Sequence, residues 1–430
     1  MKLTVFQADK GDCLLLTGAD ETRVLIDGGL AGSYSEHVAA RLGEIREAGG
    51  RLDVVYVSHI DDDHISGVLQ LLEDEVAWRV HEYQLRAGNR DHEPPAVARP
   101  PEVEEIWHNA FREQLEANSG PIEEMLAASA AVLKAGRRAE QKELAATYQN
   151  LAEGVSSAIE LARRVSPEQL GIPVNTPFRG KLGVLGTKPR VNTRGSLRFS
   201  LLGPRREDLE DLREEWNDWL KANQEALGRL RLRMAADLER LGANEVEVLR
   251  RSLELQASEL GARSRVTTPN LASLMFLVEE SGKRVLLTGD GHAREILSGL
   301  EHARKLKPGR KIHVDVLKVQ HHGSEFNIDE EFCRRVTADH YLFCANGEHA
   351  NPDPRVLTLI LDSRLGSEDA APDASAAGEF KFWFNSSAKT EAGDAEHMEQ
   401  VERLVKDRAK QSDGRFSASF LDEHYFDLEV

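Results

Sequence analysis

The strongest chemical signal in the chain is SHIDDDHISG, residues 58–67, which directly follows an apolar run. The segment carries two imidazoles, His59 and His64, and three carboxylates, Asp61, Asp62 and Asp63. Nitrogen and oxygen donors of this kind bind borderline and hard divalent cations, and a catalytic site keeps one position open for water. So many carboxylates close together are unfavourable unless a cation or a basic group balances them. The segment therefore predicts a metal site, with a solvated acidic turn as the simpler alternative.

Two later segments repeat the arrangement of an apolar run that ends in metal-binding side chains. Residues 285–291, VLLTGDG, contain Asp290, and residues 316–324, VLKVQHHGS, contain His321 and His322. Taken singly, Gly-Asp after a strand is a common turn and paired histidines can be polar surface residues. Three strand ends with His or Asp in one chain indicate more, because α/β sheets place their sites at the carboxyl edge of the strands. Together the three segments hold enough ligands for two metal ions.

Composition limits the class of protein. The 430 residues include 55 Lys and Arg and 73 Asp and Glu, so the net charge is −18. With 40% hydrophobic residues the chain can bury a core, and the acidic balance argues against nonspecific nucleic-acid binding over the whole surface, although not against a local basic groove. Three cysteines without zinc-finger spacing do not form a disulfide framework.

Hydropathy gives an expectation about location. The mean hydropathy is −0.45, and no apolar run approaches the roughly 20 residues that a membrane span needs. Asp9 interrupts the N-terminal apolar stretch too early for a secretory signal. We therefore expect a cytoplasmic protein that does not engage a membrane.

The elements that must position these residues follow from the hydrophobic pattern. Short apolar runs bounded by turn residues predict strands over 3–6, 13–16, 23–26, 53–57, 197–202, 274–278, 284–287, 314–319 and 341–344. Helical spacing predicts helices over 35–47, 354–362 and 397–409. Aromatic-rich runs predict edge strands over 380–384 and 425–430. Strands that alternate with helices are typical of an α/β fold.

Two long helical blocks interrupt this pattern. The block at 122–165 is rich in strong helix formers, and the block at 207–260 carries a Leu/Trp seam at spacings of three and four that is typical of an amphipathic helix or coiled coil. The predicted organisation begins with an α/β part (1–95), followed by a helical insertion (96–170) and a return to the α/β part (171–204). A helical hairpin or coiled coil (205–265) then precedes the second α/β part (266–430). The hairpin is predicted to pack within the chain, against another copy or against a protein partner, with a nucleic-acid arm as the alternative.

The three ligand segments resemble the metallo-β-lactamase superfamily, and in particular the hydrolase domain attached to bacterial competence proteins of DNA uptake. The superfamily motif is His-x-His-x-Asp-His, and in the competence branch it has the form Ser-His-x-Asp-x-Asp-His-x-x-Gly. This sequence resembles the second form, with His59, Asp61, Asp63 and His64 at the corresponding positions. Further segments resemble the same branch, the last two less specifically: 7–13, 25–29, 287–290, 317–324, 202–204 and 270–274. The resemblance covers about 1–90, 180–204 and 266–350 and leaves out the helical blocks.

The resemblance implies an αββα sandwich with two divalent metal ions at one edge. His59 and Asp61 would hold one ion, Asp63 and His64 the other, and Asp290 would bridge them. Either His321 or His322 would supply a further ligand.

Other residues would support the site. Asp27 would lie behind the ligands and orient them, while Lys318 and His349 would contact substrate. Each has an ordinary alternative: Lys318 could be a strand residue that faces solvent, and His349 could be a loop histidine without a role in the site.

One departure from the superfamily affects the choice of metal. Many members have another histidine ligand before the Gly-Asp segment, and here Asn270 falls near that place, so Asn270 is predicted to support the site without being an imidazole ligand. Asp61 is a harder ligand than imidazole, which shifts the preference from Zn²⁺ towards Mn²⁺ or Mg²⁺.

The ligand set and the resemblance together predict a metal-dependent hydrolase of phosphodiester bonds, most simply a nuclease acting on DNA or RNA. Two ions about 3.5–4 Å apart can activate a water and neutralise the charge of an in-line displacement, with Asp63 or Asp290 orienting the nucleophile. A small phosphodiester, such as a cyclic nucleotide or a phosphocholine-type ester, is the second hypothesis, because the negative net charge would repel a long polyanion. The third is a non-catalytic metal-binding scaffold whose helical insertions bind a protein partner.

Overall fold

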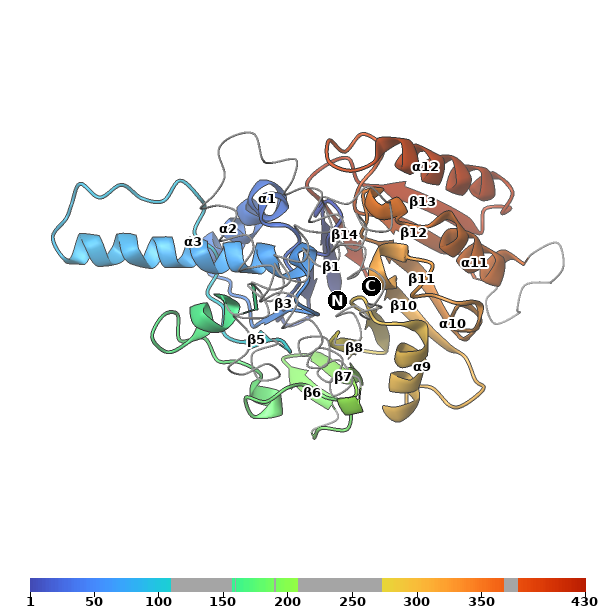
Figure 1. Cartoon of the computed structure of the whole chain (residues 1–430), viewed down its shortest axis with the longest axis horizontal. Helices are drawn as coiled ribbons and strands as arrows, with labels where there is room; N and C mark the ends of the chain where they lie inside the picture. Colours follow the sequence, from blue (N-terminus) through green and yellow to red (C-terminus); the bar gives the residue numbers. More distant parts are fainter. Residues whose placement is uncertain (110–156, 159, 189–190, 208–272, 367–377) are drawn as a thin grey trace, which may run out of the picture.

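Two mixed β-sheets pack face to face and helices cover their outer faces, as Figure 1 shows with the strands in the centre of the view. The computed structural model describes residues 1–109, 157–158, 160–188, 191–207, 273–366 and 378–430. Most of the helical block predicted at 122–165, nearly all of the block at 207–260 and Asn270 lie outside these residues. Residues 160–165, at the end of the first block, are helical.

The first sheet has six strands in the order β14-β1-β2-β3-β4-β5. Its strands are β1 (Lys2–Phe6), β2 (Leu14–Thr17), β3 (Arg23–Ile26), β4 (Val54–Tyr56), β5 (Ile106–Trp107) and β14 (Tyr425–Glu429). Strand β1 lies between β14 and β2 and is antiparallel to both, so the two ends of the chain meet in one sheet. Strands β3, β4 and β5 are parallel.

The second sheet has eight strands in the order β13-β12-β11-β10-β9-β8-β7-β6. Its strands are β6 (Val191–Arg194), β7 (Leu197–Gly203), β8 (Met275–Glu280), β9 (Lys283–Leu287), β10 (Ile312–Lys318), β11 (Val336–Phe343), β12 (Phe380–Phe384) and β13 (Phe416–Phe420). The strands from β6 to β9 are antiparallel, and those from β9 to β13 are parallel.

Side-chain alternation along the strands produces three apolar layers. In β8, Phe276 and Val278 pack between the two sheets, while Met275 and Leu277 pack under the helices on the opposite face. In β1, Leu3 and Val5 belong to the central layer and Phe6 to the layer under the other helices. Both faces of each sheet are therefore buried, which makes the strands nearly continuous in apolar residues.

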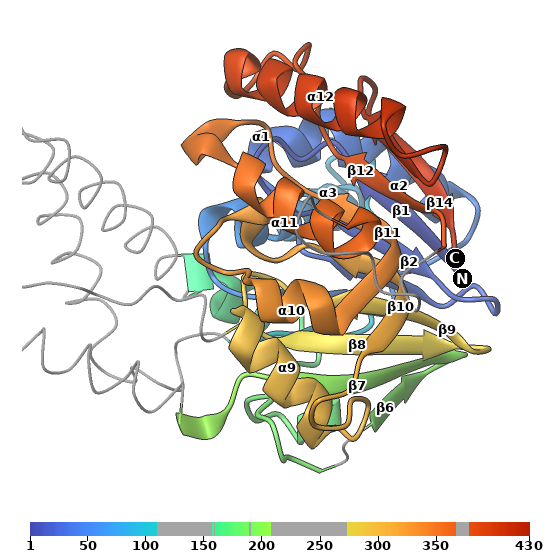
Figure 2. The same cartoon turned by 90° about the vertical axis from the view of Figure 1, so that its right-hand side faces the viewer.

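The outer layers are helical. The first sheet is covered by α1 (Ala31–Ser33), which continues through the π-helical η1 (Tyr34–Val38) into α2 (Ala39–Glu47), and by α3 (Asp62–Arg86). The second is covered by α9 (Ala293–His302), α10 (Glu330–Arg335), α11 (Pro354–Leu365) and α12 (Ala395–Lys410), which Figure 2 shows from the front. Short 3₁₀ turns are η3 (Thr176–Phe178), η5 (Gln320–Gly323) and η6 (Glu348–Ala350). The mixed α/β fold confirms the predicted αββα class.

Three expectations about the elements need correction. The strand predicted at an edge, β12, lies inside the second sheet between β11 and β13, because the following run 416–420 pairs with it. Residues 62–86, beginning within the ligand motif, form a long helix that the pattern did not reveal. Residues 106–107 belong to the first sheet and not to the helical insertion, because the two-residue strand is too short to stand out in the sequence.

The sheet topology brings the ligand segments to one edge. Strand β1 and strand β3 are both antiparallel to β2, so they run in the same direction as each other and as β4. Strands β9 and β10 of the second sheet are likewise parallel. The segments after β4, β9 and β10 carry the predicted ligands, and the loops after β1 and β3 carry Asp12 and Asp27. None of the helices in the described part of the chain has a stretch apolar and long enough to cross a bilayer.

Close packing of α3 on the first sheet requires glycine at position 67. A Cβ atom at Gly67 would collide with the carbonyl group of Gly28, and the Gly67 amide donates a hydrogen bond to Gly29 O at 2.9 Å. We expect Gly67→Ala to lower the free energy of unfolding by about 2 kcal/mol, because α3 must move off the loop. Urea unfolding followed by circular dichroism measures this change.

Gly32→Ala is the matched control. Gly32 lies in α1, and a Cβ atom there would have no neighbour within 4 Å. Its substitution should leave stability unchanged or raise it by up to about 1 kcal/mol. Equal effects of the two substitutions would contradict the packing argument.

Candidate metal centre

Four imidazoles turn the same ring nitrogen towards one buried carboxylate. The Nε2 atoms of His59, His64, His321 and His322 lie 3.7, 3.6, 3.7 and 3.5 Å from the carboxylate of Asp290. The Nε2 atoms of His64 and His322 are 3.4 Å apart. These residues come from the loops after β4, β9 and β10, so the structure brings together the three segments singled out in the sequence.

Each imidazole is oriented by a partner on its other ring nitrogen. His59 Nδ1 lies 3.0 Å from the Ser58 hydroxyl, and His64 Nδ1 lies 2.9 Å from Asp27 Oδ2. His322 Nδ1 is 2.7 Å from the carbonyl oxygen of Cys344.

His321 follows the same pattern, with Nδ1 2.6 Å from Asn327 Oδ1. A neutral imidazole that donates from Nδ1 presents its Nε2 lone pair to the centre, and an outer hydrogen bond of this kind is what orients histidine ligands of metals.

Asp27 organises the loop after β4 from behind. It accepts hydrogen bonds from the Ser58 amide and hydroxyl, both at 2.7 Å, in addition to its contact with His64. Its own backbone has a positive φ of 54°, which turns the chain sharply after β3. These contacts place Asp27 where the sequence predicted it, behind the candidate ligands.

The two adjacent histidines both reach the centre because their backbone is unusual. His321 and His322 have φ values of 46° and 56°, in the left-handed region. His322 is buried, whereas His321 keeps about a third of its side chain exposed. The structure thus brings both alternatives to the same carboxylate, with His322 the more enclosed.

The remaining candidate ligands lie on the first turn of α3 and just before it. Asp63 Oδ2 is 3.3 Å from His322 Nε2, and Asp61, at the N-cap of α3, is 3.6 Å from His59 Nε2. Both side chains are partly exposed, so this side of the centre opens to solvent.

Asp12 is a member of the site that the sequence argument did not single out. Its carboxylate lies 3.7 Å from His64 Nδ1 and 3.6 Å from His322 Nδ1, on the loop between β1 and β2. The signal was present in the Gly11-Asp12 pair within residues 7–13. Nothing in the local sequence, however, showed that this turn meets residues more than 300 positions later.

Lys318 occupies a different environment from the one expected. Its side chain is 2% exposed, and its ammonium forms an ion pair with Asp12 and donates a hydrogen bond to Gly289 O at 3.2 Å. Burial opposes its charge, but Asp12 and Asp290 outweigh that effect and raise the pKa of Lys318. Lys318 is therefore an internal cation of the centre and not a residue presented to substrate.

His349, the other predicted substrate contact, is exposed in η6, and its side chain forms no hydrogen bond or ion pair with the described residues.

Protonation in the metal-free protein reflects the crowding of carboxylates. Burial alone would lower the pKa of His59, but Asp290 and Asp61 raise it to about 10. For His322 burial is likewise outweighed, by Asp290 and Asp63, and the pKa rises to about 9. Burial disfavours ionised Asp290, but the surrounding imidazoles lower its pKa. In the absence of metal, His59 and His322 hold protons in place of a cation.

The donor set fits divalent metal ions. Two groups, Asp12–His64–His322 and His59–His64–Asp290, place one ligand atom per residue within 4.8 Å of the others, and all five residues are buried. Three of their buried atoms have no hydrogen-bond partner: Asp12 Oδ1, His59 Nε2 and Asp290 Oδ1. Buried polar atoms without partners are costly, and a bound cation would satisfy them.

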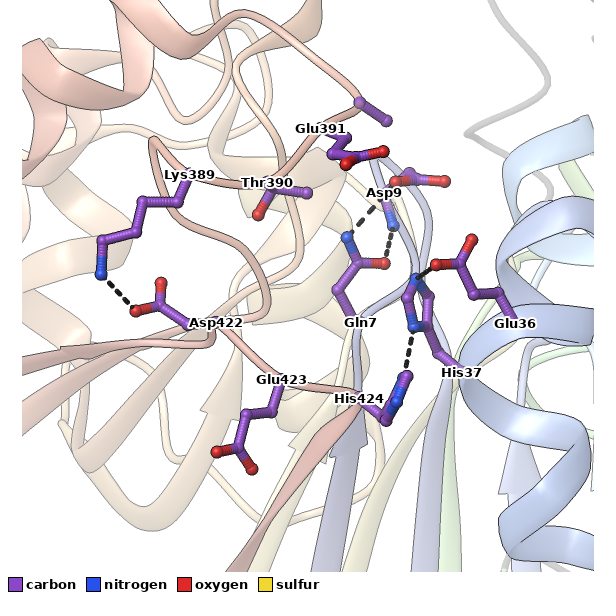
Figure 3. Close-up of a pocket in the computed structure, with 11 residues that line it drawn as sticks. Gln7, Asp9, Glu36, His37, Lys389, Thr390, Glu391, Asp422, Glu423 and His424 are labelled. Carbon is purple, nitrogen blue, oxygen red and sulfur yellow. Dashed lines mark hydrogen bonds and ion pairs between the residues drawn. The ribbon is translucent and has the colours of Figure 1, made fainter.

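A polar pocket is lined in part by Gln7 and Asp9, which lie on the same loop as Asp12. It has a volume of about 590 Å³, and Figure 3 shows it between the loop, η1 and the approach to β14. Its walls carry five carboxylates, Asp9, Glu36, Glu391, Asp422 and Glu423. Its one lysine, Lys389, is paired with Asp422 at 2.7 Å. The pocket is therefore acidic.

Comparison with known proteins identifies the first part of this site. The family model of the metallo-beta-lactamase superfamily matches residues 7–128, which include Asp12, Asp27 and the whole 58–67 segment. This stretch is similar to that superfamily, whose members are typically metal-dependent hydrolases, often with zinc. No curated protein matches the chain. The narrower resemblance to competence proteins stays a prediction.

We expect Asp290→Asn to abolish tight metal binding, because its carboxylate contacts all four imidazoles. The metal content of protein purified and then equilibrated with Mn²⁺ or Zn²⁺, measured by inductively coupled plasma mass spectrometry, should fall by at least one ion per chain. Asp315→Asn, in the middle of β10 and paired with Lys283, is the matched control and should keep full metal content. Retention of metal in Asp290→Asn would contradict the assignment.

The raised pKa values of His59 and His322 predict how the stability of the metal-free protein depends on pH. A folded-state pKa above the unfolded value of about 6.5 stabilises the folded state fully below pH 6.5, and the stabilisation is lost as pH rises through 9 to 10. The melting temperature of EDTA-treated protein should therefore fall between pH 6.5 and 10.

His322→Gln should reduce that slope, because one of the groups that bind extra protons in the folded state is removed. Differential scanning fluorimetry across this pH range tests both statements, and a melting temperature that rose with pH would contradict them.

Proposed function

We propose that the chain is a metal-dependent phosphodiesterase whose substrate is DNA or RNA. The observation that carries the proposal is the convergence of four imidazole Nε2 atoms on the buried Asp290 carboxylate, with unsatisfied ligand atoms among them. The superfamily similarity of residues 7–128 supports hydrolysis as the reaction type.

Charge balance supports two divalent ions. The centre contains five carboxylates, namely Asp12, Asp27, Asp61, Asp63 and Asp290. Lys318 contributes one positive charge, so with neutral imidazoles the sum is −5 + 1 = −4. Two divalent cations would neutralise this charge, which a buried site requires. Because oxygen ligands are as numerous as imidazoles, Mn²⁺ and Mg²⁺ are candidates alongside Zn²⁺.

Ions bound there would supply an activated water and neutralise charge on a phosphodiester. Within the protein, Asp63 is suited to accept a proton from the attacking water, since it is ionised and partly open to solvent. Asp290 is enclosed and touches every imidazole, so its role is to hold the ligands together. Lys318 fixes Asp12 in the ligand shell.

A small phosphodiester is the second candidate substrate. The net charge of −18 and the acidic pocket that Asp9 lines would both repel a long polyanion that approached from that side. The third hypothesis is a metal-binding scaffold with a protein partner or a second copy on the helical insertions. Bound metal without hydrolysis of either substrate would favour it.

The test is metal-dependent cleavage of labelled single-stranded DNA, duplex DNA and RNA, with bis(p-nitrophenyl) phosphate as the small substrate. We expect Asp63→Ala to reduce kcat on nucleic acid by 10²- to 10⁴-fold, because the proton acceptor is lost. Glu330→Ala, which removes the same charge from the exposed surface of α10, is the control and should cleave normally. Cleavage of the small ester alone would move the substrate to the second candidate.

A further inference from the structure

An exposed aromatic ring lies beside the candidate centre. Four large apolar side chains in the described part of the chain are exposed, and three of these, Val80, Tyr83 and Leu85, lie together on the outer half of α3. The fourth, Phe326, stands apart from them and is the most exposed of all at 82%. Leaving a ring of this size in water forgoes the favourable burial that phenylalanine normally gains.

The loop that presents Phe326 is firmly held. Asn327, the next residue, donates from Nδ2 to Asp290 O at 2.9 Å and accepts from His321 Nδ1 at 2.6 Å. Its backbone carbonyl accepts from Gln320 Nε2 at 3.1 Å. Phe326 is therefore held next to Asn327, whose side chain bonds to the candidate ligands Asp290 and His321. The exposure of its ring does not come from a loose loop.

A free guanidinium emerges from the segment bonded to the same loop. The Ala293 amide, at the start of α9, donates to Asn327 O at 2.9 Å. Arg294, the next residue, is exposed and forms no ion pair with any residue that the structure describes. Two other cations near these loops are already neutralised, Arg355 by Glu325 at 3.0 Å and Lys10 by Glu348 at 3.4 Å. Arg294 thus remains available for an external anion.

We propose that Phe326 and Arg294 form a nucleotide-binding rim, in which the ring stacks on an unpaired base and the guanidinium binds a backbone phosphate. The proposal rests on the proposed function and specifies its substrate as single-stranded nucleic acid. Aromatic side chains bind single strands by stacking on bases irrespective of sequence, and arginine suits phosphate by its planar array of donors. In a duplex the bases are stacked on one another and offer no free face to the ring.

The acidic pocket explains why a nucleic-acid strand would cross the protein at the rim formed by Phe326 and Arg294. Asp9, Glu36 and Glu391 line the acidic pocket (Figure 3). A polyanion would be repelled there, whereas the rim carries one unpaired positive charge and one apolar ring. The −18 net charge of the chain is thus compatible with a local path for nucleic acid.

The test compares three substrates of equal length: a single-stranded oligonucleotide, its duplex and an abasic strand that keeps the phosphates but lacks the bases. Phe326→Ala should lower kcat/KM on the single strand about tenfold and leave the abasic strand unchanged. Phe326→Trp should restore the activity, because it returns an aromatic face. Arg294→Ala should weaken cleavage of the single strand and of the abasic strand to a similar extent, because both keep the phosphates.

Binding provides a second readout that does not depend on turnover. Fluorescence anisotropy of the labelled single strand should show the same tenfold loss of affinity for Phe326→Ala in metal-free protein. Tyr83→Ala, which removes an exposed aromatic ring from the far part of α3, is the matched control and should bind as the unaltered protein does.

The outcomes separate this inference from the proposed function. Nucleic-acid cleavage that is unaffected by Phe326→Ala, or a loss that is equal on the abasic strand, overturns the rim and leaves the nuclease standing. Binding that depends on Phe326 without any cleavage supports the rim and overturns the nuclease. Neither binding nor cleavage overturns both.

Discussion

The buried carboxylate of Asp290 is the interaction on which the centre depends. It is almost completely enclosed, and four imidazoles and one ammonium lie within 3.7 Å of it. A buried negative charge is tolerated only when it is paired, and here the pairing comes from loops of both sheets. The carboxylate therefore ties the two halves of the sandwich together at the site. It also makes the centre receptive to cations, since any divalent ion that displaced the protons would occupy a site already arranged for positive charge.

The direction of the strands is what allows this convergence. Five strands, three in one sheet and two in the other, end at the same edge, and each leaves its last polar residues there. The apolar layer between the two sheets holds them against each other. In this layer the rings of Tyr56 and Phe276 pack edge to face, with their centroids 5.2 Å apart. The geometry of the ligands is consequently fixed by the core beneath them. Loops attached to a rigid base of this kind can hold unusual backbone angles, as His321 and His322 do.

Charge is arranged differently inside and outside the centre. Inside, Lys318 is enclosed and bonded to Asp12, so it sets the number of cations that the remaining carboxylates can accept. Outside, most acidic and basic groups near the loops neutralise one another, and the pocket lined in part by Gln7 and Asp9 is acidic. An acidic protein can bind an anionic substrate only where this pattern is interrupted. The segment around Arg294 and Phe326 is such a place.

The sequence by itself determined the ligand types and most of the strands that carry them, because His and Asp clusters after apolar runs and the alternation of buried strands are local patterns. The mixed α/β sandwich followed from the same patterns and from the family resemblance. The tertiary structure alone decided that Asp12 joins the centre, that Lys318 is internal and that 380–384 is an inner strand. Each of these depends on contacts between segments far apart in the chain, and no local periodicity encodes such distances. The exposure of Phe326 belongs to the same class, because no pattern in its sequence neighbourhood predicts it and only the folded loop shows the ring 82% exposed.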